Sequence, residues 1–328
     1  MIRIGILGCG RIGQVHARTL RSMDAAQIIA VSDFFPETAE KLARVCGAEV
    51  RTTDAIIASD DIDAIVVGTP TDTHFDIIKA AAKAGKAIFC EKPVDMSADN
   101  IRILIGHVEE TGVAFFTAFN RRFDPSFANV QKRVVAGEIG SVEIVTILSR
   151  DPSPPPIGYI KSSGGIFRDM MIHDFDMARF LLGEDPISVY AVGSALVDPE
   201  IGKAGDVDTA AVTLTTASGK ICQISNSRRA TYGYDQRIEV HGSAGMLRAT
   251  NVLENTVDVA TADGFRTAPT MNFFLERYEQ AYANEMRTFV AHLSDSSVAI
   301  PGIWDGLRAQ ILADAAAQSR ETGLPVSV

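Results

Sequence analysis

The chain has 328 residues, of which 46% are hydrophobic and 22% are charged, a composition typical of a soluble globular protein. This length exceeds that of one ordinary core and predicts two domains. The net charge of −10, without a run of Lys or Arg, argues against nucleic acid and against a membrane surface as partners. No apolar run approaches the roughly 18–20 residues that cross a bilayer, so we expect a small-molecule partner.

The cysteines and the N-terminus bear on localisation. The four cysteines are scattered and form no C-x-x-C pair, which argues against a metal knuckle or a redox motif and favours a reducing cytoplasm. The short apolar start lacks a basic segment and a small-residue cleavage site, so we expect no signal peptide.

Strands and helices are expected to alternate through the first 120 residues. Apolar, β-branched runs predict strands near residues 2–8, 26–33, 62–69, 86–93 and 113–120. Helical spacing predicts helices near residues 8–23, 36–47, 73–85 and 97–112, with Ser97 as the N-cap of the last one. Such alternation indicates βαβ units, and therefore a parallel sheet with helices on both faces.

A glycine-rich turn follows the first strand. Gly8, Gly10 and Gly13 form a G-x-G-x-x-G pattern, and Asp33 follows twenty residues after Gly13, at the end of the second strand. The pattern suits a tight turn, close backbone approach to a pyrophosphate and close helix–strand packing, while the helix start holds the phosphate charge. Residues 1–120 are therefore predicted to form a Rossmann domain that binds a dinucleotide through Gly8, Gly10, Arg11, Ile12, Gly13 and Asp33.

Asp33 also predicts which dinucleotide binds. A carboxylate at this position can accept hydrogen bonds from both hydroxyls of the adenosine ribose, and it would repel a 2′-phosphate. No Arg directly follows it. NAD rather than NADP is therefore the expected cofactor, and a solvated aspartate in a turn is the alternative.

Two further segments follow strands at the carboxyl edge of the predicted sheet, where ligands bind in open α/β folds. In "CEKP", Lys92 precedes Pro93, which limits the backbone and can hold a cis bond. A lysine aimed into a cleft can stabilise the alkoxide that develops as a hydride leaves an alcohol, whereas a solvated turn is the alternative. In these segments we expect cofactor contacts from Thr69, Pro70, His74, Glu91 and Lys92, although His74 could equally cap or pack a helix.

From about residue 121 the pattern changes. A helix near 124–137, a strand at 141–150, a Pro-rich loop at 151–159 and a helix at 167–182 come first. Runs with turn signals follow at 187–196, 208–229, 234–251 and 256–264, with hairpin turns at 217–220 and 242–245. Two helices close the chain at about 273–294 and 303–321. Successive strands indicate an antiparallel sheet, so residues 121–328 are predicted to form an α+β domain.

The helix at 167–182 places polar groups in an apolar setting. Asp169, His173 and Asp176 are spaced i, i+4 and i+7, so they would share one face of a largely buried helix. Buried charge is unfavourable unless it is paired or does chemistry. A histidine is suited to remove the proton of an alcohol, and a neighbouring aspartate can fix its tautomer. An internal Asp–His pair is the alternative. A metal site is not expected, because no further strong ligand is evident.

Several of these segments resemble those of one enzyme family. "GILGCGRIGQVH", "GTPTDTH", "EKP" and "GGIFRDMMIHDFDMARFLLG" are similar to motifs of the glucose–fructose oxidoreductase, inositol dehydrogenase and MocA (Gfo/Idh/MocA) family, over essentially the whole chain. "FNRRFDP" and "YGYD" look like its inositol 2-dehydrogenase branch. The resemblance implies a Rossmann domain joined to a domain with an open-faced, mostly antiparallel sheet, whose exposed face is commonly buried in oligomers. A homotetramer is therefore expected.

The resemblance also implies a reaction and its residues. NAD-dependent oxidation of myo-inositol to 2-keto-myo-inositol is expected, and the Pro-rich loop at 151–159 bears on which polyol binds. Another inositol isomer or a sugar is the alternative substrate, and a non-catalytic NAD(H) sensor is the alternative from a different class. The implied catalytic set is Lys92, Asp169 and His173. The implied substrate contacts are Lys92, Arg122, Asp151, Asp169, His173 and Tyr234.

Overall fold

The computed structural model describes residues 1–328 and divides into two compact units. The first unit comprises Met1–Phe123 and Ala281–Gln310, and the second comprises Asp124–Gln280 and Ile311–Val328. The division after Phe123 lies close to the boundary expected at residue 120, whereas residues 281–310, which we expected in the second domain, belong to the first unit. No helix combines the length and the hydropathy that a membrane span requires.

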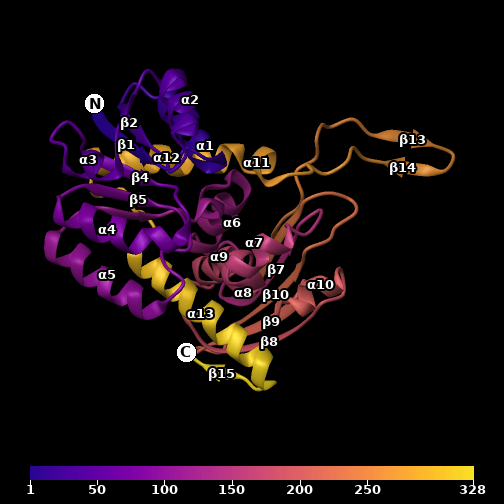
Figure 1. The fold of residues 1–328 in the computed structure, drawn as a ribbon. Coiled ribbons are helices and arrows are strands. Elements are labelled where there is room, and N and C mark those ends of the chain that lie inside the picture. The colour runs from indigo at the N-terminus through magenta and orange to yellow at the C-terminus, as the bar shows by residue number, and fades with distance from the viewer. The chain divides into compact units, whose positions relative to one another are not determined.

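The sheet of the first unit is parallel throughout and follows the order β3-β2-β1-β4-β5-β6 (Figure 1). In this doubly wound order the direction of winding reverses between β1 and β4. β1, β4 and β5 are buried almost completely, as strands covered on both faces must be. The bounds are β1 (Ile2–Leu7), β2 (Ala26–Ser32), β3 (Glu49–Val50), β4 (Ala64–Val67), β5 (Ala87–Cys90) and β6 (Phe115–Thr117).

Helix α5 (Ala98–Thr111) begins and ends at residues that favour such ends. Ser97 caps α5 as predicted, because its hydroxyl accepts a hydrogen bond from the N–H of Asn100 at 3.3 Å. Gly112 ends this helix in the left-handed conformation, with φ 67°. The short β3 and α3 were not predicted, because so few residues carry no periodic pattern. The bounds are α1 (Arg11–Arg21), α2 (Pro36–Cys46), α3 (Thr53–Ala58), α4 (His74–Lys83) and α5 (Ala98–Thr111).

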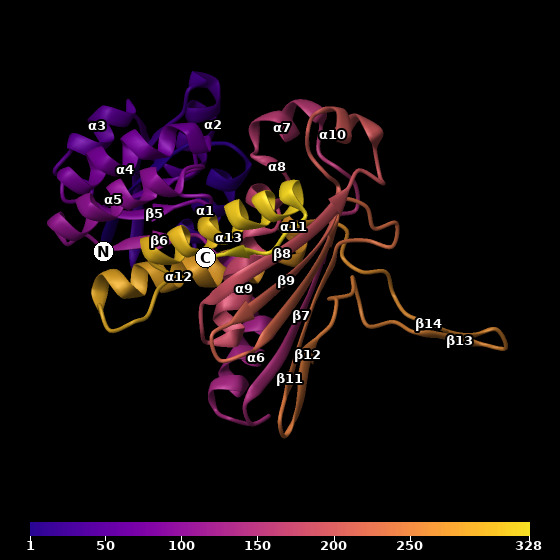
Figure 2. The ribbon, with the colours of Figure 1, turned by 90° about the horizontal axis from the view of Figure 1, so that it is seen from below.

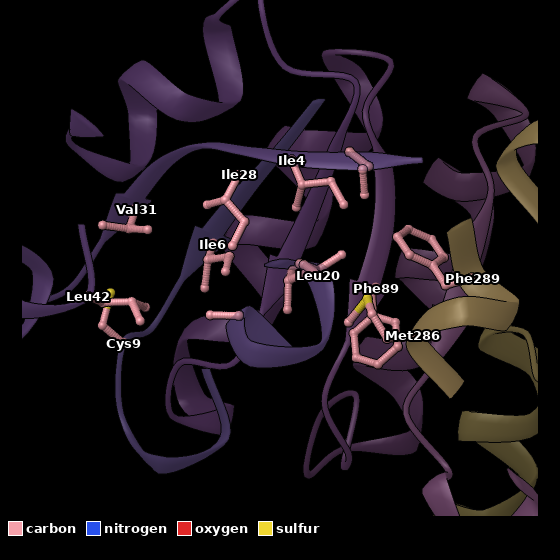
Figure 3. Packing of buried hydrophobic residues seen from close by; sticks show 14 of the residues in the cluster. Ile4, Ile6, Cys9, Leu20, Ile28, Val31, Leu42, Phe89, Met286 and Phe289 are labelled. Carbon is pink, nitrogen blue, oxygen red and sulfur yellow. The ribbon is translucent and has the colours of Figure 1, made fainter. Parts of the chain in front are cut away.

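Apolar side chains of α12 (Glu279–Ser294) explain why the later segment belongs to the first unit. Met286 and Phe289 lie beside Phe89 of β5 in the core of this unit (Figure 3). The ring centroids of Phe89 and Phe289 are 5.5 Å apart, and Phe116 of β6 stacks on Phe89 at 4.9 Å. Burying a large apolar side chain is worth about 1.5–3 kcal/mol, so these contacts hold α12 against the parallel sheet.

The second unit is built on a seven-stranded sheet in the order β12-β11-β7-β10-β9-β8-β15. β7 and β10 run parallel and the other neighbours are antiparallel, which confirms the expected mostly antiparallel sheet. α9 (Ile172–Leu182) packs against β7 and β10, and α6 (Pro125–Val135) packs against α9 (Figure 2). The bounds are β7 (Val142–Arg150), β8 (Pro186–Ser194), β9 (Thr209–Thr216), β10 (Ile221–Ser227), β11 (Asp235–Gly242), β12 (Gly245–Ala249) and β15 (Val326–Ser327).

The face of this sheet away from α9 exposes apolar side chains. Along β8, Val189 is buried, whereas Ile187, Tyr190 and Val192 are exposed. Because side chains alternate between the two faces of a strand, Val189 lies on the core face of β8, whereas Tyr190 and Val192 lie on the surface face. Ile187 lies where the register of β8 shifts.

The remaining elements are short or lie near the C-terminus. β13 (Val259–Thr261) and β14 (Gly264–Arg266) form a separate hairpin that projects from the second unit (Figure 1). The helix expected at 273–294 is broken at Tyr278, between α11 and α12. The other bounds are α7 (Ile157–Ser162), α8 (Gly165–Asp169), α10 (Pro199–Lys203), α11 (Phe274–Arg277) and α13 (Ile303–Thr322).

The single helix expected over residues 167–182 was wrong. α8 ends where the N–H groups of Met170 and Met171 both bond to the carbonyl oxygen of Ile166, at 3.1 and 2.9 Å. The second bond spans five residues, one more than an α-helical bond, and this wider turn separates α8 from α9. The apolar side chains continue across the break, so their spacing did not reveal it.

Candidate active site

The glycine-rich loop between β1 and α1 has no room for side chains at two positions. Gly8 has φ +92°, and a Cβ there would lie 2.5 Å from the backbone of Gly68. A Cβ on Gly13 would lie 2.0 Å from the carbonyl oxygen of Gly8. At Gly10, in contrast, a Cβ would meet no atom within 4 Å. The loop therefore closes on itself at Gly8 and Gly13 and leaves open space beside Gly10, directly before the first turn of α1.

Asp33 lies beside this loop at the end of β2. Its Oδ2 accepts a hydrogen bond from the N–H of Cys9 at 2.6 Å, and its Oδ1 accepts one from the N–H of Phe35 at 2.9 Å. These contacts orient the carboxylate toward the loop. Each oxygen has two lone pairs, so each can accept a second donor.

Lys92 lies in a turn that is tied to the sheet on its N-terminal side. The N–H of Glu91 donates to the carbonyl oxygen of Val67 at 2.9 Å, which continues the pairing of β4 with β5. The Lys92–Pro93 peptide bond is cis. The turn therefore starts at the carboxyl edge of the parallel sheet, as the sequence predicted.

His74 is buried at the start of α4 and ties this turn on its other side. Its Nδ1 lies 3.0 Å from the carbonyl oxygen of Pro93, and its Nε2 lies 3.0 Å from that of Thr69. Burial lowers the pKa of His74, although the two carbonyl oxygens oppose the shift. The ring thus joins the Lys92 turn to the loop that holds Thr69 and Pro70, as the packing alternative expects, and its direct contact with a cofactor stays a prediction.

Asp169 is held by two side chains that sequence patterns did not single out. The hydroxyl of Tyr159 donates to its Oδ1 at 2.9 Å, and Nη2 of Arg228 lies 3.5 Å from its Oδ2. Arg228 is 1% exposed, and a second carboxylate, that of Asp206, lies 3.9 Å from the same nitrogen. Partial burial and the negative charge of Asp169 raise the pKa of Tyr159, so the phenol stays protonated and able to donate.

His173 is a partly exposed polar residue in the first turn of the largely buried α9. Asp169 ends α8 and His173 lies in the first turn of α9, so no continuous helix carries both. Within residues 172–178, His173 alone is not buried. Nδ1 of its ring is buried, so another molecule would have to reach this residue at its other atoms.

The carboxylates further along α9 are buried and interact with other side chains of the protein. Asp174 is fully buried and accepts hydrogen bonds from Oγ of Ser149 at 2.6 Å and from Nδ2 of Asn226 at 2.9 Å. Asp176 is 1% exposed and lies 3.9 Å from Nη1 of Arg179. The expected stripe that joined Asp176 to the catalytic pair on one helix is therefore wrong, because Asp176 lies in the core with a cation one turn away.

The three other predicted substrate contacts lie at or near the ends of elements. Nη2 of Arg122 donates to Oδ1 of Asp305 at 2.9 Å. Asp151 directly follows β7. Tyr234 is 7% exposed, and its ring meets that of Tyr278 edge-on with the centroids 6.0 Å apart. Their contacts with a substrate stay predictions.

Two family models match the chain. An oxidoreductase family with an NAD-binding Rossmann fold matches residues 2–119, and the GFO/IDH/MocA C-terminal domain matches residues 127–248. The chain is 55% identical to the inositol 2-dehydrogenase of Rhizobium meliloti (strain 1021), over 97% of this chain and 96% of that relative. The chain belongs to the Gfo/Idh/MocA oxidoreductase family.

Solved structures of other proteins agree with this assignment. A myo-inositol dehydrogenase from Corynebacterium glutamicum ATCC 13032 is 42% identical and has a TM-score of 0.95, covering 100% of this chain and 99% of that one. A scyllo-inositol dehydrogenase from Lactobacillus casei, with bound NAD(H) and scyllo-inositol, is 30% identical with a TM-score of 0.92, covering 100% and 99%. The family and the fold class predicted from the motifs are thus confirmed.

The first unit of this Gfo/Idh/MocA protein is an NAD-binding Rossmann domain, and its residues fit the cofactor. The space beside Gly10 leaves the start of α1 open to a pyrophosphate, whose charge the helix start would stabilise. The oriented carboxylate of Asp33 suits the two hydroxyls of an adenosine ribose. The contacts of the individual residues with NAD stay predictions.

Proposed function

We propose that the protein oxidises a secondary hydroxyl of a cyclic polyol, with myo-inositol as substrate and 2-keto-myo-inositol as product. The observation that carries this proposal is the 55% identity to an inositol 2-dehydrogenase over 97% of the chain. The lysine turn, the partly exposed histidine and the restrained aspartate described above supply the side chains that such an oxidation needs.

NAD⁺, when bound, accepts the hydride that leaves the substrate carbon. His173 would accept the hydroxyl proton at a ring nitrogen, since a histidine can act as a base near neutral pH. Lys92 would donate to the substrate oxygen and stabilise the negative charge that develops there. Asp169, which Tyr159 and Arg228 hold in place, would orient His173 or a substrate hydroxyl.

The remaining substrate contacts in this proposal decide which polyol binds. Arg122, Asp151 and Tyr234 would hydrogen-bond the other ring hydroxyls. scyllo-Inositol is the second candidate substrate, because a relative that covers the whole chain is named for it. Tyr159, at the end of the Pro-rich segment 151–159 and within α7, contacts Asp169 directly, so this segment would influence the choice.

We also propose a homotetramer in the cytoplasm. Tyr190 and Val192 expose apolar groups on one face of the large sheet, and a second copy would cover them. The four cysteines are free thiols, which a reducing compartment favours. Light scattering after gel filtration measures the mass, and a monomer at assay concentration would contradict the assembly.

A panel of polyols and sugars tests the activity. Purified protein is incubated with NAD⁺ and with myo-inositol, scyllo-inositol, other inositol isomers or aldoses, and NADH formation is followed by absorbance. We expect the highest kcat/KM with myo-inositol and a ketone product that mass spectrometry identifies. A higher kcat/KM with another compound would reassign the substrate. Absence of turnover with every compound, together with retained NAD binding, would favour a sensor.

A further inference from the structure

Two buried ionisable side chains of the first unit have no part in the proposed reaction: His16 of α1 and Glu285 of α12. Both are 0% exposed. They meet Glu91, the residue before Lys92, and one polar atom from each of the three lies within 4.8 Å of the others. Because water cannot stabilise charge at this depth, the charge that each of the three groups carries depends on the other two.

The imidazole of His16 holds Glu91. Its Nε2 lies 2.7 Å from Oε1 of Glu91, which is a hydrogen-bond distance. The ring stands edge-on to Phe89 at 4.9 Å and to Tyr282 at 6.1 Å between centroids, so aromatic neighbours fix its plane. With Nε2 as the donor in a neutral ring, Nδ1 is an acceptor. This atom is buried and has no hydrogen-bond partner.

Glu285 provides the complementary donor when its carboxyl is neutral. Both of its oxygens are buried without a hydrogen-bond partner. An ionised carboxylate without a donor is destabilised by several kcal/mol. Burial first, and then the negative charge of Glu91, raise the pKa of Glu285 well above its ordinary value. The neutral acid adds no second negative charge beside Glu91, and it carries one O–H donor within 4.8 Å of the His16–Glu91 pair.

His and Glu side chains also bind metal ions, but the distance between His16 and Glu91 fits a hydrogen bond better than a shared metal ion. Two ligands of a tetrahedral zinc ion, with bonds of about 2.0–2.1 Å, lie roughly 3.3 Å apart. Nε2 of His16 and Oε1 of Glu91 are only 2.7 Å apart. This pair therefore shares a hydrogen and not an ion.

The cluster lies next to the lysine turn. Glu91 and Pro93 flank Lys92, and a buried histidine holds each of them. His16 holds the side chain of Glu91 at 2.7 Å, and His74 holds the carbonyl oxygen of Pro93 at 3.0 Å. The direction of Lys92 thus depends on how firmly its two neighbours are held.

We propose that Glu285 is a positioning residue that, as a neutral acid, completes the His16–Glu91 pair and thereby fixes the turn that carries Lys92. The proposal rests on the proposed function, in which Lys92 donates to the substrate oxygen. Misplacing a reacting group by about 1 Å lowers a rate by on the order of 10²-fold. Loss of the cluster therefore lowers kcat more than it weakens NAD binding, because Glu91 and Lys92 are only two of the predicted cofactor contacts and the others, at the glycine-rich loop and at Asp33, stay in place.

Two substitutions separate positioning from packing. Glu285→Met fills the same volume among apolar neighbours but can neither donate nor accept a hydrogen bond. We expect kcat to fall at least tenfold, with the KM for NAD changed less than threefold and the Tm unchanged or raised, since replacing a buried polar group by a hydrophobic one is often stabilising. Glu285→Gln keeps a neutral donor and acceptor and is expected to retain kcat within threefold. Phe289→Leu, on the same helix and in the same core, is the matched control, with a lowered Tm and an unchanged kcat.

The results that overturn the inference are distinct from failure of the proposed function. Wild-type turnover of myo-inositol is measured first, because its absence refutes the reaction and not the cluster. Infrared spectroscopy without substrate tests whether Glu285 is protonated. We expect the wild type to show a carboxylic-acid C=O band that Glu285→Gln removes. The inference is overturned by persistence of that band, by a kcat within twofold of wild type in Glu285→Met, or by a tenfold loss in Glu285→Gln. The inference is also overturned if the wild type binds one equivalent of metal and Glu285→Met does not.

Discussion

The hydrogen bond from Tyr159 to Asp169 can be removed with little disturbance elsewhere. Tyr159→Phe deletes one hydroxyl from a side chain that is 50% exposed and whose oxygen lies 2.9 Å from Oδ1 of Asp169. Arg228 keeps its contact with Oδ2 at 3.5 Å, so the carboxylate retains a partner but loses the hydrogen bond from Tyr159. The substitution therefore affects the orientation of Asp169 more than the stability of the fold.

The size of the effect follows from the kind of bond. A hydrogen bond to a charged group contributes about 1.5–3 kcal/mol, and partial exposure of Tyr159 favours the lower end of this range. Since about 1.4 kcal/mol corresponds to a factor of ten, we expect kcat/KM for myo-inositol to fall about tenfold. The KM for NAD and the Tm should stay close to those of the wild type.

The assay compares this variant with Tyr232→Phe. Tyr232 is 51% exposed and donates to Oδ2 of Asp235 at 2.7 Å, so the same deletion removes a similar bond to a carboxylate that has no predicted role in the reaction. Initial rates are measured over a range of myo-inositol concentrations at saturating NAD⁺. If Tyr159→Phe keeps kcat/KM within twofold, or if both variants lose activity equally, the restraint on Asp169 has no part in the reaction.

Three further substitutions test other parts of the structure. Asp33→Ala should raise the KM for NAD about tenfold and weaken the discrimination against NADP, because the acceptor for the ribose hydroxyls is lost; steady-state kinetics with both cofactors measure this, and an unchanged KM for NAD would contradict it. His173→Ala should lower kcat by about 10²–10⁴-fold while fluorescence titration shows unchanged NAD binding, whereas activity within a few-fold of wild type would mean that another group is the base. Asp124→Ala should destabilise the protein by about 3–5 kcal/mol in urea unfolding, because Arg277, 2% exposed, loses its carboxylate partner. Asp124→Asn keeps the helix cap and should be about 1 kcal/mol less destabilised than Asp124→Ala, and a loss below 1 kcal/mol in both variants would show that the buried pair contributes little.

The parallel sheet was predictable because its strands and helices repeat a pattern over many residues. Each buried strand of the first unit carries several apolar side chains in succession, and the glycine-rich turn lies where such a sheet binds a dinucleotide. The two hairpin turns expected at 217–220 and 242–245 were also located correctly, since Gly residues mark them, whereas the turn between β13 and β14 was not predicted. The break between α8 and α9 at Met170 was missed because the apolar spacing continues across the turn.

The polar contacts around the candidate site were not predictable in this way. Tyr159 and Arg228 reach Asp169 from positions 10 and 59 residues away, and no spacing rule joins them. In the sequence, Glu285 looks like an ordinary polar residue of a helix, although it is 0% exposed in the structure.

The amino-acid order alone thus specifies the family, the cofactor domain and the residue types for the chemistry, because apolar periodicity and glycine-rich motifs are local and redundant. Which carboxyl is held by a tyrosine and an arginine, and which is kept neutral beside an imidazole, depends on folding. A hydrogen bond needs two atoms within about 3 Å, and chain segments far apart in the sequence reach that distance only when the apolar cores bring them together.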